Sequence, residues 1–324
     1  MLVPVLLFAV GLVCLIKGGD WFVDGATDLA RRVHVPEFII GATVVSIGTT
    51  LPEVMVSATS AVKGIGDMAY GNAIGSIICN TALISAITIA IRPGKVDRKS
   101  FAAPVAFFFA AAAFYVFISY AFREFTRVTG IILLCMFVAY MLFVMVRGFR
   151  NPEPAAEEGE EEALPLWKMI LYLVAGAALI AVGAQLLVNN GTKIAEALGV
   201  PDTVIALTFV ALGTSLPELV TAISSLAKGH SNLSLGNIVG ANLFNLVLVC
   251  GLSVTLAPFK LPTEKTIAGM NASLVVDLPL MLLVMIILTI PTLIRGRLSR
   301  AQGIILLATY AAFCVYQFAG PSFL

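Results

Sequence analysis

Charged side chains are scarce in this sequence. Only 12% of its 324 residues are Asp, Glu, Lys or Arg, whereas 59% are apolar. Soluble domains contain about 25% charged and roughly 45–50% apolar residues, so an ordinary soluble protein is excluded. The net charge of +1 leaves no basic excess that would favour a nucleic-acid partner. The composition suits a lipid bilayer, which we expect to be the main partner of the chain.

Histidine and cysteine are also rare. The only histidines are His34 and His230, and the five cysteines stand singly in apolar stretches. Neither residue type has the close, paired spacing of a zinc site or a disulfide framework. We therefore expect the cysteines to be small core or lipid-facing residues, and we expect no cofactor.

Long apolar runs, in contrast, fill the chain. A membrane-spanning helix needs about 20 mostly apolar residues. Such runs predict an all-α membrane protein with ten transmembrane helices, at residues 2–29, 37–62, 69–91, 101–121, 128–146, 167–194, 202–227, 234–257, 271–293 and 301–319.

The distribution of Lys and Arg predicts the orientation of these helices. The loops after the odd-numbered helices hold most of these residues, and such loops face the cytoplasm. Both termini are then outside, and the Glu-rich segment between helices 5 and 6 is cytoplasmic. That segment has few apolar residues with which to fold, so a solvated linker is its simplest interpretation, and a calcium-sensing element is the alternative.

The sequence contains two related copies. A shift of 165 residues aligns 18–80 with 183–245 without a gap, and roughly a third of the paired residues are identical. Each copy holds five predicted helices, and this odd number makes the second copy enter the membrane from the opposite side. We therefore predict an inverted repeat with a first five-helix unit at 1–150, an acidic linker at 151–166 and a second unit at 167–324. Glycine pairs in both copies, 71/75 and 236/240, have the G-x-x-x-G spacing of close helix contacts.

One glutamate in each copy lies at the predicted membrane midplane. Glu53 is ten residues before Lys63, and ten helical residues rise about 15 Å, which is half of the apolar thickness. Glu218 and Lys228 repeat this spacing. An ionised side chain at the midplane costs about 2.5 kcal/mol or more, and such residues usually mark ion or proton pathways.

Neutral oxygen atoms surround both glutamates in the sequence. The hydroxyl side chains one turn earlier are Thr49, Thr50, Thr214 and Ser215. Pro52 and Pro217 lack an N–H and are expected to help unwind their helices, which would free carbonyl groups, including those of Ser46 and Ala211. The facing helices add the amides and hydroxyl of Asn72, Ser76, Asn80, Asn237 and Asn245, while Ala241 interrupts the stripe in copy two. Asn72 and Asn237 could instead bond a neighbouring helix.

These ligand types suit a hard cation. Calcium takes six to eight oxygen ligands in flexible cages. Sodium is similar in size, and two glutamates balance the charge of one calcium or two sodium ions. This equivalence of charge predicts a site that can carry either cargo.

At these residues the chain resembles the cation/calcium exchanger superfamily, and especially its prokaryotic sodium/calcium antiporter branch. The resemblance rests on GTTLPE (48–53) with GTSLPE (213–218), and on GNAIGSIICN (71–80) with GNIVGANLFN (236–245). It implies antiport of calcium for sodium by sliding of helices 1 and 6. It also implies ion coordination by Ser46, Thr49, Thr50, Glu53, Ser76, Asn80, Ala211, Thr214, Ser215, Glu218, Ala241 and Asn245. Some relatives have Asp and Ser in place of Asn245 and Ala241, which leaves the sodium stoichiometry open.

Three other functions remain as alternatives. A proton/calcium exchanger would use the glutamates as proton carriers, because no histidine lies near the midplane. A passive cation channel shares the ligand set but has no evident need for two inverted copies. An intramembrane hydrolase would need an activated nucleophile or a metal-bound water, which the sequence does not indicate.

Overall fold

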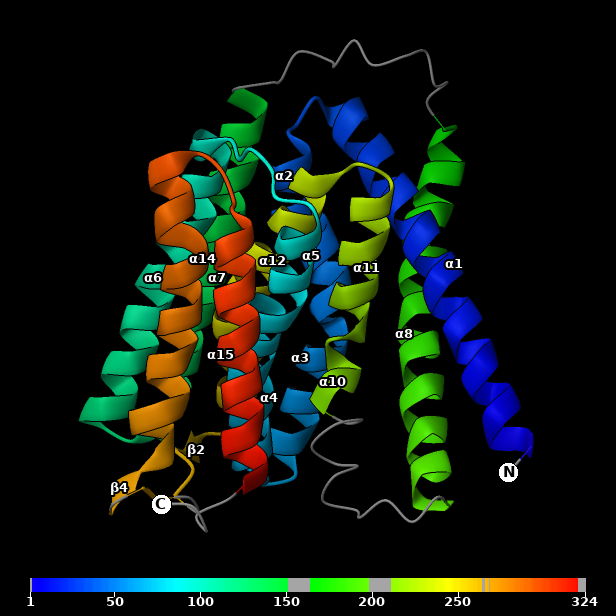
Figure 1. The fold of residues 1–324 in the computed structure, drawn as a ribbon. Helices are drawn as coiled ribbons and strands as arrows, with labels where there is room; N and C mark the ends of the chain where they lie inside the picture. Colours follow the sequence, from blue (N-terminus) through cyan, green and yellow to red (C-terminus); the bar gives the residue numbers. More distant parts are fainter. Residues whose placement is uncertain (1, 151–163, 198–210, 264–265, 268, 320–324) are drawn as a thin grey trace. The chain divides into compact units, whose positions relative to one another are not determined.

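The computed structural model describes residues 2–150, 164–197, 211–263, 266–267 and 269–319, and helices dominate them (Figure 1). The first half of the chain forms α1 (Leu2–Val33), α2 (Glu37–Ile40), η1 (Gly41–Val45), α3 (Ser46–Val62), α4 (Gly66–Cys79), η2 (Asn80–Ser85), α5 (Ala86–Ile91), α6 (Arg98–Ala121), β1 (Glu124–Phe125) and α7 (Arg127–Arg150). The second half forms α8 (Leu166–Ala197), α10 (Ala211–Thr214), α11 (Leu216–Ala227), α12 (Ser231–Phe244), η4 (Asn245–Cys250), α13 (Gly251–Leu256), β2 (Phe259–Lys260), β3 (Thr266–Ile267), β4 (Met270–Asn271), η5 (Ser273–Asp277), α14 (Leu278–Arg295) and α15 (Arg300–Ala319). The elements marked η are π-helical turns.

Eight helical segments of the described residues are long and apolar enough to cross a membrane. They coincide with eight predicted spans and run over Leu2–Val33, Glu37–Val62, Gly66–Ile91, Arg98–Ala121, Arg127–Arg147, Leu166–Gly191, Ser231–Leu256 and Ser273–Arg295. The tenth predicted span falls on α15, a helix of 20 residues. The seventh, 202–227, begins outside the described residues and ends in α10 and α11. The all-α membrane architecture is thus confirmed, while the count of ten helices stays a prediction.

Secondary structure repeats with the same 165-residue shift as the sequence. The elements α4, η2 and α5 begin and end at residues that correspond one by one to those of α12, η4 and α13. Both copies also turn through a glycine with positive φ, Gly64 at 79° and Gly229 at 89°. A positive φ is nearly free of strain only for glycine, so this loop geometry depends on the residue found in both copies.

The two copies differ where the sequence predicts unwinding at proline. The first copy keeps an unbroken α-helix from Ser46 to Val62 with Pro52 inside it, so the expected unwinding at Pro52 is wrong. The π-helical turn η1 comes directly before this helix. Its backbone hydrogen bonds join residues five apart, whereas those of the α-helix join residues four apart. In the second copy the helix does break, at Ser215, whose φ and ψ are −89° and 4°.

The described chain forms two compact units, and each unit takes segments from both sequence copies. Unit 1 contains 1–49 and 144–237, and unit 2 contains 50–143 and 238–324. The division into an N-terminal repeat, an acidic linker and a C-terminal repeat therefore stays a prediction about the sequence.

In unit 1, the long helices α1 and α8 lie side by side along much of their length (Figure 1). Their contact is lined by glycine because the two backbones approach closely. A Cβ at Gly176 would lie 2.6 Å from the Phe22 nitrogen, and one at Gly18 would lie 2.8 Å from the Ile180 nitrogen. Both distances are well inside ordinary contact, so neither position accommodates a larger residue without separating the helices.

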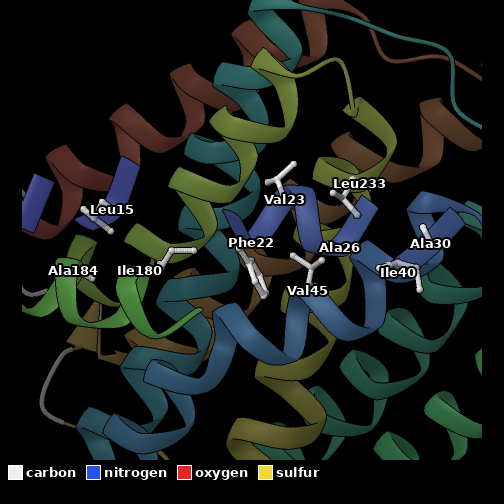
Figure 2. Packing of buried hydrophobic residues seen from close by; sticks show 10 residues of the cluster. All are labelled: Leu15, Phe22, Val23, Ala26, Ala30, Ile40, Val45, Ile180, Ala184 and Leu233. Atoms are coloured by element: carbon white, nitrogen blue, oxygen red, sulfur yellow. The ribbon is translucent and has the colours of Figure 1, made fainter. Parts of the chain in front are cut away.

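Apolar side chains continue this contact onto neighbouring segments of unit 1. Figure 2 shows the Phe22 and Val45 side chains close together. The full cluster consists of Leu15, Phe22, Val23, Ala26, Ala30, Ile40, Val45, Ile180, Ala184 and Leu233. The turn before α3 is thereby packed on α1.

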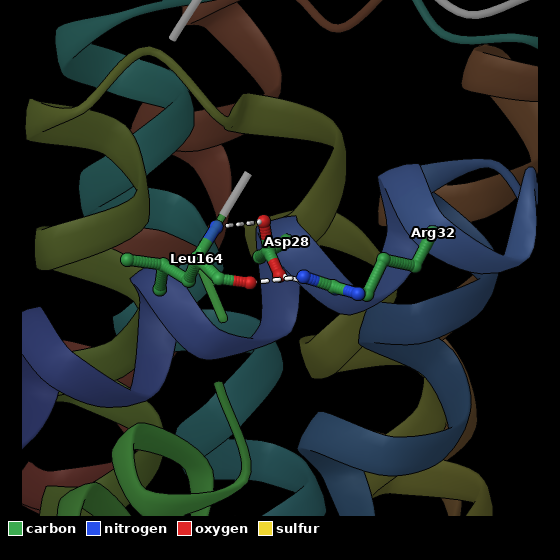
Figure 3. Close-up of polar contacts among 3 residues, drawn as sticks. All are labelled: Asp28, Arg32 and Leu164. Atoms are coloured by element: carbon green, nitrogen blue, oxygen red, sulfur yellow. Dashed lines mark hydrogen bonds and ion pairs between the residues drawn. The ribbon is translucent and has the colours of Figure 1, made fainter. Parts of the chain in front are cut away.

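Two polar contacts add to the packing of α1. Lys228, just after α11, donates a hydrogen bond to Asp24 at 2.7 Å and another to the Asp20 carbonyl at 2.9 Å. At the end of α1, Asp28 accepts hydrogen bonds from the Leu164 N–H at 3.0 Å and from Arg32 at 2.9 Å (Figure 3). Arg32 also donates to the Leu164 carbonyl oxygen. Residues 151–163 of the predicted acidic linker (151–166) lie outside the described residues, and this contact holds Leu164, near the end of that linker, against α1.

Unit 2 has a separate apolar core. It brings together Ala82, Ala86, Ile89, Val284, Leu288 and Leu306, so that η2 and α5 pack against α14 and α15. The β1 and β2 strands pair antiparallel, with Glu124 opposite Lys260, and join the loops after α6 and α13. Cysteines do not cross-link the molecule, because all five are free: Cys14, Cys79, Cys135, Cys250 and Cys314.

Candidate functional site

Both predicted glutamates are fully buried. Glu53 lies in the middle of α3, and Glu218 lies in the first turn of α11, and each has 0% of its surface exposed. Because Glu218 lies in the first turn, it is close to the positive end of the α11 dipole. Removing a carboxylate from water costs several kcal/mol unless opposite charge or hydrogen bonds compensate. Two such residues at equivalent positions are therefore suited to a positively charged cargo.

The hydroxyl groups that precede Glu53, those of Ser46, Thr49 and Thr50, are buried. Thr49 Oγ1 donates a hydrogen bond to Asn237 Oδ1 at 3.1 Å. Ser46 Oγ lies 2.8 Å from the Gly41 carbonyl oxygen and 2.9 Å from that of Asn237, and its single proton serves one of them at a time. Thr50 Oγ1 has no hydrogen-bond partner among the described residues. Because Thr49 and Ser46 use their protons on Asn237 or Gly41, their oxygen lone pairs stay available to a cation.

The second copy presents a similar but looser arrangement around Glu218. Ser215 lies at the break between α10 and α11, and its Oγ is buried without a hydrogen-bond partner in the described part of the chain. Thr214 ends α10 and is only partly buried. Ala211 begins α10, and the predicted contribution of its carbonyl stays a prediction.

Two buried asparagines have the clearest signature of ligands. Asn80 and Asn245 are each 0% exposed. Neither the nitrogen nor the oxygen of their side-chain amides has a hydrogen-bond partner among the described residues. A buried amide without a partner costs about 1–3 kcal/mol, so such groups usually serve a purpose. Both asparagines begin π-helical turns, η2 and η4, and such turns are frequent at functional sites.

Helix α4 in unit 2 positions these groups. Ser76 is buried one turn before Asn80, and η4, which begins with Asn245, packs against α4. Ala241 is also buried, and its methyl group offers no ligand where Ser76 offers a hydroxyl. The predicted gap in the second stripe is therefore a real chemical difference between the copies.

Asn72 and Asn237, for which two roles were open, both bond neighbouring helices. The Asn72 amide donates to Ser57 Oγ at 2.8 Å and to the Glu53 carbonyl oxygen at 3.3 Å. Asn237 accepts from Thr49, as described above, and lies within hydrogen-bond distance of Ser46. These two residues hold the helices that carry the candidate ligands.

The two glycine pairs differ in their surroundings among the described residues. A Cβ at Gly236 would overlap the Phe38 carbonyl oxygen, so the close helix contact predicted there is confirmed. A Cβ at Gly71 or Gly75 would meet nothing within 4 Å among the described residues, so the contact predicted there stays a prediction. Within the described residues, close packing at this spacing is seen at Gly236. Sequence reasoning also missed the Lys228–Asp24 ion pair, because charges 204 residues apart give no local signal.

Side chains that commonly bind metals are not clustered in threes or more in the described residues. No group of three or more His, Cys, Asp or Glu side chains lies together there. The candidate ligands are carboxylate and hydroxyl oxygens in both units and amide oxygens in unit 2, and these are the types that hard cations prefer.

Comparison with known proteins agrees with these features. The model of the family described as sodium/calcium exchanger protein matches residues 3–146 and 168–319. A protein named as an antiporter from Alkalimonas amylolytica is 36% identical over 329 residues, which cover 98% of each chain. The sodium/calcium exchanger MaX1 of Methanosarcina acetivorans is 32% identical over 350 residues, which cover 97% of this chain and 98% of the relative.

A solved structure gives the same result for the fold. The structure of the sodium-calcium exchanger NCX_Mj soaked with sodium and calcium has a TM-score of 0.78 and 31% identity, over 96% of this chain and 97% of the other. The helices and these matches identify a multi-pass membrane protein. The chain belongs to the sodium/calcium exchanger protein family.

Proposed function

We propose that this protein is a secondary antiporter that exchanges calcium for sodium at a site built around Glu53 and Glu218. Its ligands would be Ser46, Thr49, Thr50, Ser76, Asn80, Ala211, Thr214, Ser215 and Asn245. The observation that carries the proposal is the duplication of buried, chemically hard groups with one 165-residue shift. In each copy a fully buried glutamate is accompanied by a fully buried asparagine whose amide finds no hydrogen-bond partner in the described chain.

The charge of these groups explains how exchange can be coupled. Two ionised glutamates balance one calcium ion or two sodium ions, and either cargo leaves the loaded site neutral. The empty site carries two negative charges, and moving these through a low-dielectric region is costly. Only the loaded protein therefore changes readily the side of the membrane to which its site opens. This requirement couples the flow of one ion to the flow of the other. Asn245 is neutral and therefore does not change this charge balance.

The packing of α1 on α8 supports alternating access. In each helix only about a quarter or less of the most apolar window is buried, 22% for α1 and 24% for α8. Two long helices that contact each other through glycine, while most of the most apolar window of each stays exposed, are suited to move together as a pair. We propose that this pair moves to expose the site to one side of the membrane and then to the other.

The orientation of the chain is part of the proposal. From the excess of Lys and Arg in the loops after odd-numbered helices, both termini face outside and the acidic linker faces the cytoplasm. Cysteine labelling from one side of intact cells tests this arrangement independently of transport.

Transport in proteoliposomes tests the function. Vesicles containing the protein are preloaded with sodium, potassium or choline at matched pH, and entry of radiolabelled calcium is measured. We expect accumulation only in sodium-loaded vesicles. An imposed pH gradient forms a separate arm. Accumulation driven by protons without regard to sodium would instead identify a proton/calcium exchanger, and equal entry in all vesicles, only down the calcium gradient, would identify a channel.

A further inference from the structure

Positive charge is concentrated at two loops of unit 2. One loop joins α5 to α6, the other joins α14 to α15, and both lie at the same end of the unit (Figure 1). The segments 92–99 and 295–300 contain one acidic residue, Asp97. They also contain seven basic residues, all of them exposed, which we call the basic platform: Arg92, Lys95, Arg98, Lys99, Arg295, Arg297 and Arg300.

Backbone pairing places two of these charges directly opposite each other. The loops pair antiparallel at Lys95 and Arg297. They are held together by two backbone hydrogen bonds of 2.9 Å, from the Val96 and Leu298 N–H groups to the carbonyl oxygens of Gly296 and Gly94, respectively. Because these bonds join the neighbours of Lys95 and Arg297, the pair is of the closer antiparallel type, with about 4.5 Å between its Cα atoms. Like charges directly opposite each other destabilise such a pairing.

The alternation of side chains turns both charges away from the protein. Val96 is buried, and Leu298 packs against the apolar core of unit 2. Successive residues of an extended segment point to opposite faces, so Lys95 and Arg297 point away from that core. Neither of them forms an ion pair or a side-chain hydrogen bond within the described residues. The fold therefore holds two like charges close together without an acidic partner from that part of the chain.

Membrane topology and helix ends do not account for this pair. An excess of Lys and Arg orients a membrane protein wherever these residues stand in its loops, so two of them need not face each other. Arg98 has a structural role, because it donates a hydrogen bond to the Ile294 carbonyl oxygen near the end of α14. Asp97 is the N-cap of α6 and accepts hydrogen bonds from two N–H groups of that helix. Lys95 and Arg297 have no such role.

Exposed apolar side chains stand directly beside the basic platform. Ile91, the last residue of α5, is 64% exposed, and Ile294, which precedes Arg295, is 69% exposed. They lie at the ends of two helical segments that are long and apolar enough to cross a membrane, Gly66–Ile91 and Ser273–Arg295. The platform is thus at the depth where lipid headgroups meet hydrocarbon chains. A ligand with an anionic phosphate and an apolar tail matches both features, whereas a free phosphate ion matches only the charge.

We propose that the basic platform binds the headgroup of an anionic phospholipid, with the lipid phosphate between Lys95 and Arg297. By the orientation predicted from the loops, this end of the protein faces the cytoplasm, and anionic lipids of that leaflet attract basic segments next to the membrane. The bound phosphate offsets the repulsion between the two side chains and so strengthens the pairing of the loops. None of the proposed transport ligands belongs to either loop, and the proposal does not depend on exchange.

Lipid binding to the full-length protein tests this surface. The protein in a neutral detergent is titrated with phosphatidylglycerol or with phosphatidylcholine of the same acyl chains, and bound lipid is counted by native mass spectrometry. We expect phosphatidylglycerol to bind more tightly. Its affinity should fall as the concentration of ammonium acetate rises, because salt screens exposed charges. Glycerophosphoglycerol, the same headgroup without its chains, forms a separate arm and should not compete at equal concentration.

Lys95→Gln combined with Arg297→Gln should weaken the apparent affinity for phosphatidylglycerol by about tenfold or more. The matched control is Arg123→Gln combined with Arg127→Gln. It also removes two exposed basic residues from unit 2, but from the side predicted to face outside, and it should keep the affinity of the parent.

The melting temperature gives a second measurement, which stays informative if the double variant does not fold. In detergent without anionic lipid, Arg297→Gln alone should melt at or above the temperature of the parent, because it removes the repulsion with Lys95. Added phosphatidylglycerol should then raise the melting temperature of the parent more than that of this variant, because a ligand stabilises the protein that binds it more tightly.

Equal affinity for the two lipids, or equal affinity of the parent and the Lys95→Gln, Arg297→Gln variant for phosphatidylglycerol, would overturn the proposal. Competition by glycerophosphoglycerol at equal concentration would also overturn it, because the site would then recognise a soluble phosphate. Binding is measured without an ion gradient, so its failure leaves the proposed exchange untouched. Conversely, failure of sodium-driven calcium uptake would leave this surface untouched.

Discussion

Replacing Gly176 with alanine tests whether α1 and α8 depend on close backbone contact. The added Cβ would lie 2.6 Å from the Phe22 nitrogen and 2.9 Å from the Gly18 carbonyl oxygen. All of these neighbours are backbone atoms, which no side-chain rotation can move away. Since ordinary contacts lie at about 3.5–4.0 Å, the two helices would have to separate locally by about 1 Å.

The expected cost follows from this separation. A gap of 0.5–1 Å forfeits about a quarter to a half of the contact energy across it. Overpacking typically costs about 1–3 kcal/mol, and alanine recovers about 0.5–1 kcal/mol through its better helix propensity. We expect a net loss of about 1–2 kcal/mol, seen as a fall of about 2–6 °C in the melting temperature of the solubilised protein.

Gly75→Ala is the matched control for this change. It is also a mid-helix glycine, but its added Cβ meets nothing within 4 Å among the described residues. This variant should melt at the same temperature as the parent or slightly above it, by the propensity gain of about 0.5–1 kcal/mol. If Gly176→Ala and Gly75→Ala melt alike, the close approach of α1 and α8 is refuted.

Three further changes test other contacts. Asn80→Leu should keep or raise the melting temperature, because it removes a buried amide that has no hydrogen-bond partner in the described chain, yet it should abolish calcium uptake; retained uptake would exclude Asn80 as a ligand. Lys228→Gln should cost no more than about 1 kcal/mol, since its ion pair with Asp24 is partly exposed, and the loss should shrink in high salt; a loss that salt does not change would contradict an ionic origin. Asp97→Ala removes the N-cap of α6 and should cost about 0.5–2 kcal/mol at neutral pH. Burial raises the pKa of Asp97, but hydrogen bonds from Ser100 and Lys99 outweigh it and hold this pKa below its ordinary value, so the difference from the parent should shrink in unfolding measurements as the pH falls through the folded-state pKa.

Much of the fold could be predicted because membrane helices leave a strong compositional signal. Runs of about 20 apolar residues located eight segments that the structure also presents as long apolar helices. The internal repeat was equally accessible, and the boundaries of α4, η2 and α5 recur in α12, η4 and α13 with the shift found in the sequence. The apolar runs are a local signal, and the repeat is found by comparing the two copies directly.

Other features depend on three-dimensional neighbours and left no such signal. Pro52 was expected to unwind its helix, but α3 continues through it. A proline removes one hydrogen bond, and tight packing on both sides can retain the helical path. Likewise, G-x-x-x-G spacing shows which face of a helix carries small residues. It does not determine whether another helix packs against that face. Gly236 has such a neighbour, whereas Gly75 does not have one among the described residues.

The candidate site was predictable in its residue types but not in its division of roles. The burial of Glu53, Glu218, Asn80 and Asn245 follows from their places within apolar helices. The sequence could not show that Asn237 would be used by Thr49, while Asn80 and Asn245 would keep their amide groups unused by any described residue. That distinction depends on atoms brought together from distant segments.

The most direct test of the two-glutamate site is sodium-driven calcium uptake by Glu53→Gln and Glu218→Gln, each reconstituted in vesicles. Glutamine retains the shape and removes the charge, so each variant should fold while its uptake falls to that of empty vesicles. Glu124→Gln, an exposed glutamate on β1, should transport like the parent and controls for the loss of a carboxylate as such. Near-normal uptake by either of these two glutamine variants would contradict the central claim that both glutamates bind the transported ions.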